Sequence, residues 1–181
     1  MKQSLRHSIT TTLIALALTS TAVVHAADDL KTLQASSDAA IKNFTDTDAG
    51  LKAFFKNSAA YVILPSVGEG GFIIGGEHGK GLVYEKGALI GKSSLTVVSI
   101  GAQVGGGSFS EVVFFETPEA FKEFKTGKYT MNAQAKATVA ASGVAANAKY
   151  TQGVLVFTLP KSGVMASAAI GGQKFTFEAI K

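Results

Sequence analysis

Apolar residues in the segment after residue 26 recur at the spacing of a helix. Five of them share one face of a helix with 3.6 residues per turn: Leu30, Leu33, Ala40, Ile41 and Phe44. The oxygens of Asp46, Thr47 and Asp48 can cap a second short helix, which would carry Leu51, Phe54 and Phe55. Because short helices are marginal alone, we expect both to bury their apolar faces against another surface.

From Tyr61 onward the apolar period changes to two, which is typical of strands. The sequence predicts strands at 61–64, 71–76, 81–84, 98–105, 111–116, 129–142, 154–159, 164–170 and 174–180. Pro65 is expected to end the first strand, because proline has no N–H for a ladder. Val112 to Phe115 is apolar on both faces and should be a central strand. The alternation over 129–142 is the cleanest in the chain and predicts one long strand.

Turns and a helix separate these strands. Lys86-Gly87 and residues 161–163 are expected turns, and Thr117-Pro118 starts a short helix that Gly127 ends. The predicted fold class is therefore α+β. N-terminal amphipathic helices would pack on a curved antiparallel core, similar to a β-barrel or a sandwich, with one short inserted helix.

Glycine is concentrated in one part of the chain, since 13 of the 20 glycines lie between Gly68 and Gly107. The pattern matches neither a Walker phosphate loop nor a dinucleotide-binding loop. We interpret these glycines as structural, at positions of sheet curvature or close backbone approach. The five that we single out are Gly71, Gly75, Gly76, Gly79 and Gly81. Gly75→Val or Gly76→Val should lower stability.

The N-terminus has the pattern of an export signal. Lys2 and Arg6 precede a short apolar stretch, and Val24-His25-Ala26 has the residue types that a signal peptidase reads. We expect residues 1–26 to be a signal peptide and 27–181 a single domain, helical over 27–59 and mainly β over 60–181. The removed segment holds two of the 17 basic residues and no acidic one, so the net charge falls from +4 to +2.

Composition excludes several kinds of chemistry. The chain has no cysteine, and His78 is the one histidine left after processing, so a disulfide, a thiolate site or a multi-histidine metal centre cannot form. A charge near +2 is too weak to indicate nucleic-acid binding. No nucleophile elbow is present, and His78 has no identifiable catalytic partner. We therefore expect no enzyme, no cofactor and no metal.

Two groups of lysines are candidates for contact with anionic headgroups, where each can contribute about 1 kcal/mol. Lys80, Lys86 and Lys92 flank predicted turns of the glycine-rich region and are the preferred group. Lys122, Lys125 and Lys128 cluster at the end of the short helix and are secondary. Favourable charge at a helix C-terminus also explains the second group.

The order of several motifs resembles the SYLF-domain lipid-binding family, formerly described as an actin-binding domain. The motifs are PSVGEGGFIIGGEHGKG at 65–81, GAQVG at 101–105, FKTGKY at 124–129, ATVAASG at 137–143 and the segment from Tyr150 to Ala169. The similarity spans roughly Leu30 to Ile180. One departure is that Ala88 to Leu95 lacks the tryptophan that members often carry. The resemblance implies a phospholipid-binding module.

Together these features predict a periplasmic or secreted protein that associates peripherally with anionic phospholipid surfaces. We expect no actin partner for an exported protein, and the sequence identifies no protein partner. Two alternatives remain open. One is a small outer-membrane β-barrel, and the other is a structural or assembly module that binds another envelope protein.

Overall fold

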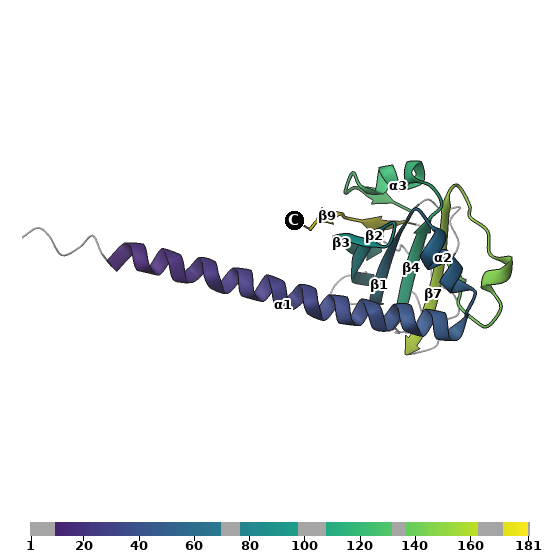
Figure 1. Cartoon of the computed structure of the whole chain (residues 1–181), viewed down its shortest axis with the longest axis horizontal. Helices are drawn as coiled ribbons and strands as arrows, with labels where there is room; N and C mark the ends of the chain where they lie inside the picture. Colours follow the sequence, from purple (N-terminus) through teal and green to yellow (C-terminus); the bar gives the residue numbers. More distant parts are fainter. Residues whose placement is uncertain (1–9, 70–76, 98–107, 132–136, 163–171, 181) are drawn as a thin grey trace, which may run out of the picture.

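The structure is a computed structural model that describes residues 10–69, 77–97, 108–131, 137–162 and 172–180 (Figure 1). Within the first helix, side chains are described from Asp29 onward. The helices are α1 (Thr10–Thr47), α2 (Leu51–Asn57), α3 (Pro118–Phe124) and the 3-10 helix η1 (Ala145–Asn147). The strands are β1 (Ala60–Glu69), β2 (Glu77–Glu85), β3 (Ala88–Val97), β4 (Ser108–Phe115), β5 (Tyr129–Thr130), β6 (Ala137–Val139), β7 (Val154–Ser162), β8 (Gln173–Phe175) and β9 (Glu178–Ala179). The strands predicted at 71–76, 98–105 and 164–170 lie outside the described residues.

These strands form one sheet. Eight of them follow the order β5-β8-β3-β2-β1-β4-β7-β6, and β9 pairs with β3 beside β8. The described pairs are antiparallel except β6–β7, which is parallel. The prediction of an α+β chain with a curved sheet is therefore confirmed, and the prediction of a wholly antiparallel core is wrong for one pair. As predicted, β4 is central, between β1 and β7.

The sheet curls strongly. Gln173 on β8 and Glu111 on β4 are separated by three strands in the sheet order, yet Gln173 Nε2 donates a hydrogen bond of 2.9 Å to Glu111 Oε2. Both side chains are buried. A flat sheet would hold these positions about four strand spacings of roughly 4.8 Å apart, so the concave face must close around the contact.

The prediction of one long strand over 129–142 is wrong. Tyr129–Thr130 pairs with β8 at one edge of the sheet, whereas Ala137–Val139 pairs with β7 at the opposite edge. Alternation reports that a segment is extended and half-buried, but it does not report which neighbour it pairs with. The expected strand at 174–180 is likewise divided, into β8 and β9.

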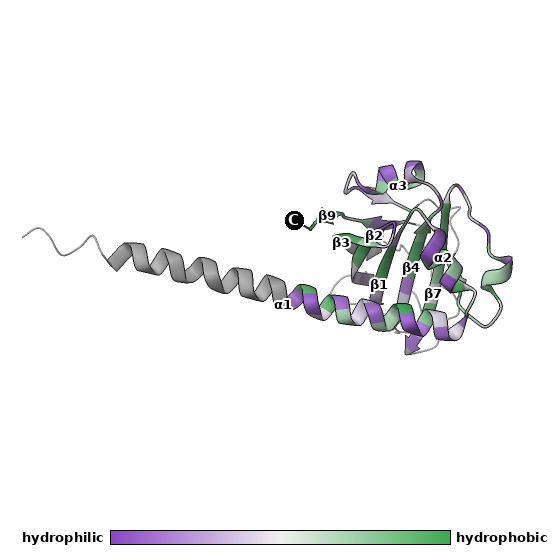
Figure 2. Ribbon diagram, in the orientation of Figure 1, coloured by the Kyte–Doolittle hydropathy of each residue, from purple (hydrophilic) through white to green (hydrophobic). Residues whose placement is uncertain are grey.

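Each face of the sheet has its own apolar cluster. The first cluster packs α3 against the concave face, with Phe121 and Phe124 fully buried beside Phe115. The second contains Phe44 of α1 and Leu51 of α2, packed against the other face with Ile63 and Phe114. The alternation of β1 and β4 sends successive side chains to these two clusters, which is why residues 60–64 of β1 and 112–115 of β4 are apolar on both faces (Figure 2).

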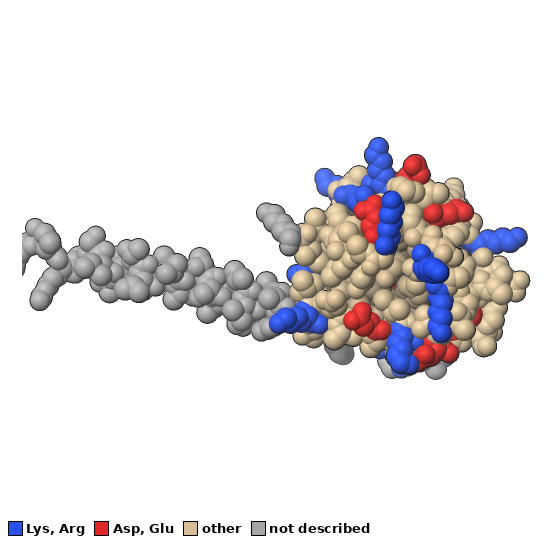
Figure 3. All heavy atoms as spheres, in the orientation of Figure 1, with Lys and Arg blue, Asp and Glu red and all other residues tan. Residues whose placement is uncertain are grey.

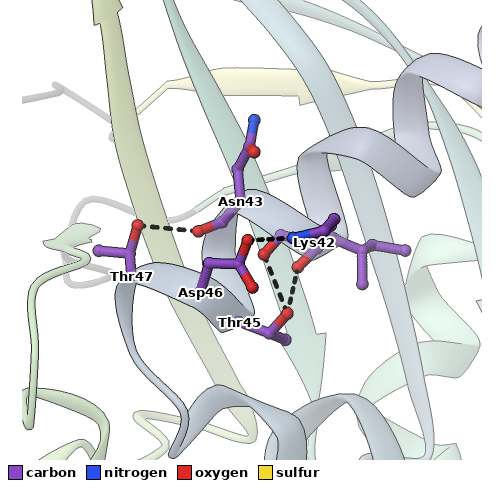
Figure 4. A network of polar contacts seen from close by, with 6 residues as sticks. Lys42, Asn43, Thr45, Asp46 and Thr47 are labelled. Atoms are coloured by element: carbon purple, nitrogen blue, oxygen red, sulfur yellow. Dashed lines mark hydrogen bonds and ion pairs between the residues drawn. The ribbon is translucent and has the colours of Figure 1, made fainter.

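Helix α1 has the apolar face that the sequence predicts. Ala40 and Phe44 are buried, and Leu30, Leu33 and Ile41 lie partly buried against the same cluster. At its C-terminal end, Thr45 and Thr47 donate hydrogen bonds to carbonyls three or four residues earlier, and Lys42 pairs with Asp46 (Figure 4). The helix runs continuously through the predicted processing position between residues 26 and 27. Among the described residues, no helix is long and apolar enough to span a membrane.

The predicted N-terminal cap is confirmed for one short helix, α3, and is wrong for the other, α2. Thr117 caps α3, since its Oγ1 accepts a 3.2 Å hydrogen bond from Ala120 N. For α2 the prediction is wrong, because the N-cap residue is Gly50 and no side chain caps it. Asp48 instead accepts hydrogen bonds from the N–H of Ala145, at 2.8 Å, and of Gly50, at 2.9 Å. The bond from Ala145 is the main cause that lowers the pKa of Asp48, and it ties the α1–α2 connection to η1.

Candidate functional site

A groove of about 600 Å³ lies between residues 29–36 of α1 and the outer face of the sheet, which is the face opposite the concave one. Three lysines line it, Lys80 from β2, Lys92 from β3 and Lys161 from β7. The α1 side contributes Asp29, Thr32, Leu33 and Ser36, and the C-terminal segment contributes Thr176 and Glu178. The volume is within the range of about 300–1,000 Å³ that is typical of small-molecule sites.

Strand alternation places the first two lysines on the outer face. Lys80 precedes Leu82 and Tyr84 on β2, and these two apolar residues belong to the cluster beneath α1 and α2. Lys92 on β3 stands opposite Leu82, and Lys80 stands opposite Ser94. Lys80 and Lys92 are therefore diagonal neighbours, with their Cα atoms about 7–8 Å apart. Two ammonium groups at that spacing can contact the oxygens of one phosphate.

The third lysine, Lys161, is held at the groove by Pro65, which lines the groove together with Lys80 and Lys92. Lys161 Nζ donates a 3.2 Å hydrogen bond to Pro65 O, which also accepts a 2.8 Å bond from Ser110 Oγ. Pro65 does not end its strand as predicted, because β1 continues to Glu69 through an irregularity between Ile63 and Ser66. A bulge tolerates proline, which has no N–H to donate.

No carboxylate among the described residues forms an ion pair with the lysines of the groove. Within the described part of the chain, Lys80 and Lys92 form no hydrogen bond or ion pair, and Lys161 donates to the carbonyl of Pro65. Asp29 and Glu178 line the same groove but form no ion pair with these lysines there. The described lining residues thus carry three positive and two negative charges, an excess of one positive charge among them.

The other candidate lysines lie elsewhere. Lys86 is in the turn between β2 and β3, with φ 51°, and Gly87 follows it with φ 79°, so the predicted turn is present. Six residues of extended strand, or about 20 Å, separate Lys86 from Lys80, so Lys86 is outside the groove. The structure therefore brings together two members of the preferred group and not the third.

The secondary lysines are on and after α3. Lys125 Nζ lies 2.9 Å from Glu85 Oε1 and 5.0 Å from the centroid of the Phe121 ring, so its charge is partly satisfied. Lys122 and Lys128 are exposed. On the face shown in Figure 3, basic and acidic side chains are interspersed, without a broad patch of one sign.

Two of the five glycines singled out from the sequence are described. A Cβ atom at Gly81 would lie 2.3 Å from Ile63 O, and one at Gly79 would lie 2.9 Å from Val67 Cγ2. Both values mark a close approach of β1 to β2. Gly71, Gly75 and Gly76 lie outside the described residues. The loss of stability predicted for Gly75→Val and Gly76→Val therefore stays a prediction.

The sequence reasoning missed Lys161 as a site residue. It placed residues 161–163 in a turn, but β7 continues through Ser162. No local pattern links Lys161 to Lys80 and Lys92, because 81 positions separate Lys80 from Lys161 in the chain. Their proximity depends on the sheet order. His78 is exposed, and in the described ranges no three acidic or histidine side chains gather as metal ligands would.

In comparisons with known proteins, no family model matches the chain, and no curated protein matches it. A proposal about function therefore has to be argued from the geometry of the groove.

Proposed function

We propose that this protein is a non-enzymatic, periplasmic lipid-binding protein that associates peripherally with anionic phospholipid surfaces. The groove beside α1 would receive the headgroup phosphate, and Lys80, Lys92 and Lys161 would contact it. The observation that carries the proposal is that three lysines from three different strands meet at one groove of headgroup size. The resemblance to the SYLF family, stated above from its motifs, supports the same class of ligand.

The size of the expected effect follows from the charges. With about 1 kcal/mol for each lysine near an anionic surface, three lysines contribute about 3 kcal/mol, or roughly a hundredfold in affinity. A net charge of +2 on the processed chain supplies no strong field by itself, so a local group must supply the attraction. The side of α1 that faces the sheet, from Asp29 to Ser36, would form the second wall of the site.

The test is flotation of the purified protein with anionic and neutral liposomes at low and moderate salt. The variant Lys80→Glu/Lys92→Glu/Lys161→Glu should lose most of its binding to anionic liposomes. The matched control Lys122→Glu/Lys125→Glu/Lys128→Glu has the same change of net charge and should retain binding. Parent binding should weaken with salt, since the Debye length shrinks to about 8 Å at physiological ionic strength.

Two outcomes would contradict the proposal. Equal loss in both triple variants would mean that total charge, and not the groove, determines binding. Failure of the parent to float with any liposome would exclude a membrane-surface role. Thermal unfolding of each variant shows whether it is folded. We expect both triple variants to unfold near the temperature of the parent, because exposed charge changes usually alter stability little.

The proposed location has its own test. If residues 1–26 are a signal peptide, the exported protein begins at Ala27, and its intact mass will show this directly. A retained Met1 in the exported protein would show that the segment is kept.

A further inference from the structure

The groove is lined by both signs of charge, which says more about its ligand than the lysines alone. Asp29 of α1 and Glu178 of β9 line the groove together with the three lysines. A ligand that carried only negative charge would meet repulsion from both carboxylates. The lining is instead complementary to a ligand that carries a phosphate and a cationic group close together.

The position of Glu178 is fixed by the sheet. Glu178 stands directly opposite Lys92 in the β3–β9 register. Backbone hydrogen bonds hold the segment on both sides of it, from Thr176 N to Ser94 O at 2.9 Å and from Ile180 N to Ile90 O at 3.0 Å. The hydroxyl groups of Ser94 and Thr176 also lie 2.6 Å apart. These bonds fix the backbone of Glu178, so its exposed side chain starts from a defined position beside the lysine that would bind phosphate.

We infer that the groove recognises a phosphoethanolamine headgroup, a conclusion that rests on the proposed function. Its phosphate oxygens contact Lys80 and Lys92, and its ammonium group donates to the carboxylate of Glu178 or of Asp29. The two-carbon linker of this headgroup keeps the two charges close, as the neighbouring positions of Lys92 and Glu178 require. The surface attraction still comes from anionic lipids, while the occupant of the groove is the zwitterionic one.

A primary ammonium group should be favoured over the quaternary group of choline. Ammonium has three N–H donors, and a hydrogen bond from a charged donor to a carboxylate is about twice as strong as a neutral one. Choline carries the same charge but has no N–H to donate. Loss of that hydrogen bond at a partly enclosed site corresponds to about a tenfold loss of affinity.

The experiment compares vesicles with the same low phosphatidylglycerol content, filled with either phosphatidylethanolamine or phosphatidylcholine. The parent protein should bind the ethanolamine vesicles about tenfold more tightly. The double variant Asp29→Asn/Glu178→Gln should bind both vesicles equally, at the level of the choline vesicles. Glu119→Gln, which removes an exposed acid on α3, should keep the parent's preference. The double variant separates the headgroup contact from general effects of ethanolamine on membrane packing, because a packing effect would leave its preference unchanged.

A soluble arm distinguishes the lipid from a free phosphate compound. Phosphoethanolamine should compete with the ethanolamine vesicles better than phosphocholine or inorganic phosphate. If the parent floats equally with both vesicles, the inference is overturned and the proposed function stands. If the parent floats with neither, the proposed function itself fails. If soluble phosphoethanolamine binds while the vesicles show no preference, the lipid headgroup is the wrong source of the ligand.

Discussion

The two faces of the sheet are covered in different ways, and the candidate site lies where the cover is incomplete. The concave face is closed by the curl of the sheet and by α3, which buries Phe121 and Phe124. On the other face, α1 and α2 cover the apolar cluster around Phe44 and Leu51. Beyond that cluster the strands present Lys80 and Lys92 to a groove beside α1.

The lysines illustrate the same difference. Lys125, near α3, is paired with Glu85 and lies over the Phe121 ring, so its local structure accounts for it. Lys80 and Lys92 have no such partner within the described residues. An apolar face that is fully covered stabilises the fold, whereas a face that is partly covered can present charged groups to a ligand. This comparison can be tested by the following variants.

The largest effect is expected from Gly81→Val, because β2 contributes to both faces. A Cβ atom at this position would lie 2.3 Å from Ile63 O, and the backbone of β1 cannot move away without disturbing both clusters. We expect a loss of more than about 4 kcal/mol in the free energy of unfolding, enough to unfold a marginally stable domain. Urea unfolding measures this. Gly87→Ala is the control, with open space around it and a cost of about 1–2 kcal/mol from its positive φ. Equal stability of the parent and Gly81→Val would contradict the close approach.

The next test compares the helices that pack on the two faces of the sheet, with Phe44→Ala on α1 and Phe121→Ala on α3. Both rings are fully buried, so each variant should lose about 3–5 kcal/mol. Asn43→Ala, at an exposed position next to Phe44, should cost less than about 0.5 kcal/mol. Chemical unfolding of the three variants decides the matter. A near-neutral Phe44→Ala would mean that α1 does not cover the outer face, and the groove would then lose its second wall.

A smaller effect, dependent on pH, is expected from Asp48→Ala. The hydrogen bonds from Ala145 and Gly50 favour the charged carboxylate, and the folded-state pKa is lower than the ordinary value of 3.8. Asp48 therefore stabilises the fold fully above that ordinary pKa, and the contribution is lost as the pH falls through the lower folded-state value. At neutral pH the variant should lose about 1.5–3 kcal/mol. Unfolding measured at pH 7, 5 and 3 should show the gap between parent and variant shrinking at the lowest pH, whereas a constant gap would contradict this role.

The smallest effect is expected from Lys125→Ala. Its ion pair with Glu85 is partly exposed, and such pairs contribute about 0.2–1 kcal/mol. Double-mutant cycles with Glu85→Gln isolate the pair, and added salt should reduce the coupling energy. A coupling energy well above that range would show that the α3 lysines have a larger structural role than their exposure suggests.

Local patterns in the sequence determined a good part of the fold. The spacing from Leu30 to Phe44 predicted a helix with the face that is now seen to be buried at Ala40 and Phe44. The apolar run Val112 to Phe115 predicted a central strand, and Thr117-Pro118 predicted a capped helix start. These features depend on residues a few positions apart, so short-range periodicity and capping chemistry are sufficient to predict them.

The pairing of strands and the composition of the groove were decided only by the tertiary structure. Alternation over 129–142 could not show that its two described parts pair at opposite edges of the sheet. Proximity to turns selected Lys80 and Lys92 but also Lys86, and it did not select Lys161. Whether these side chains share a site depends on strand order, on the bulge at Pro65 and on the path of α1. Such contacts join residues far apart in the chain, where side-chain packing and register, and no local preference, determine which groups meet.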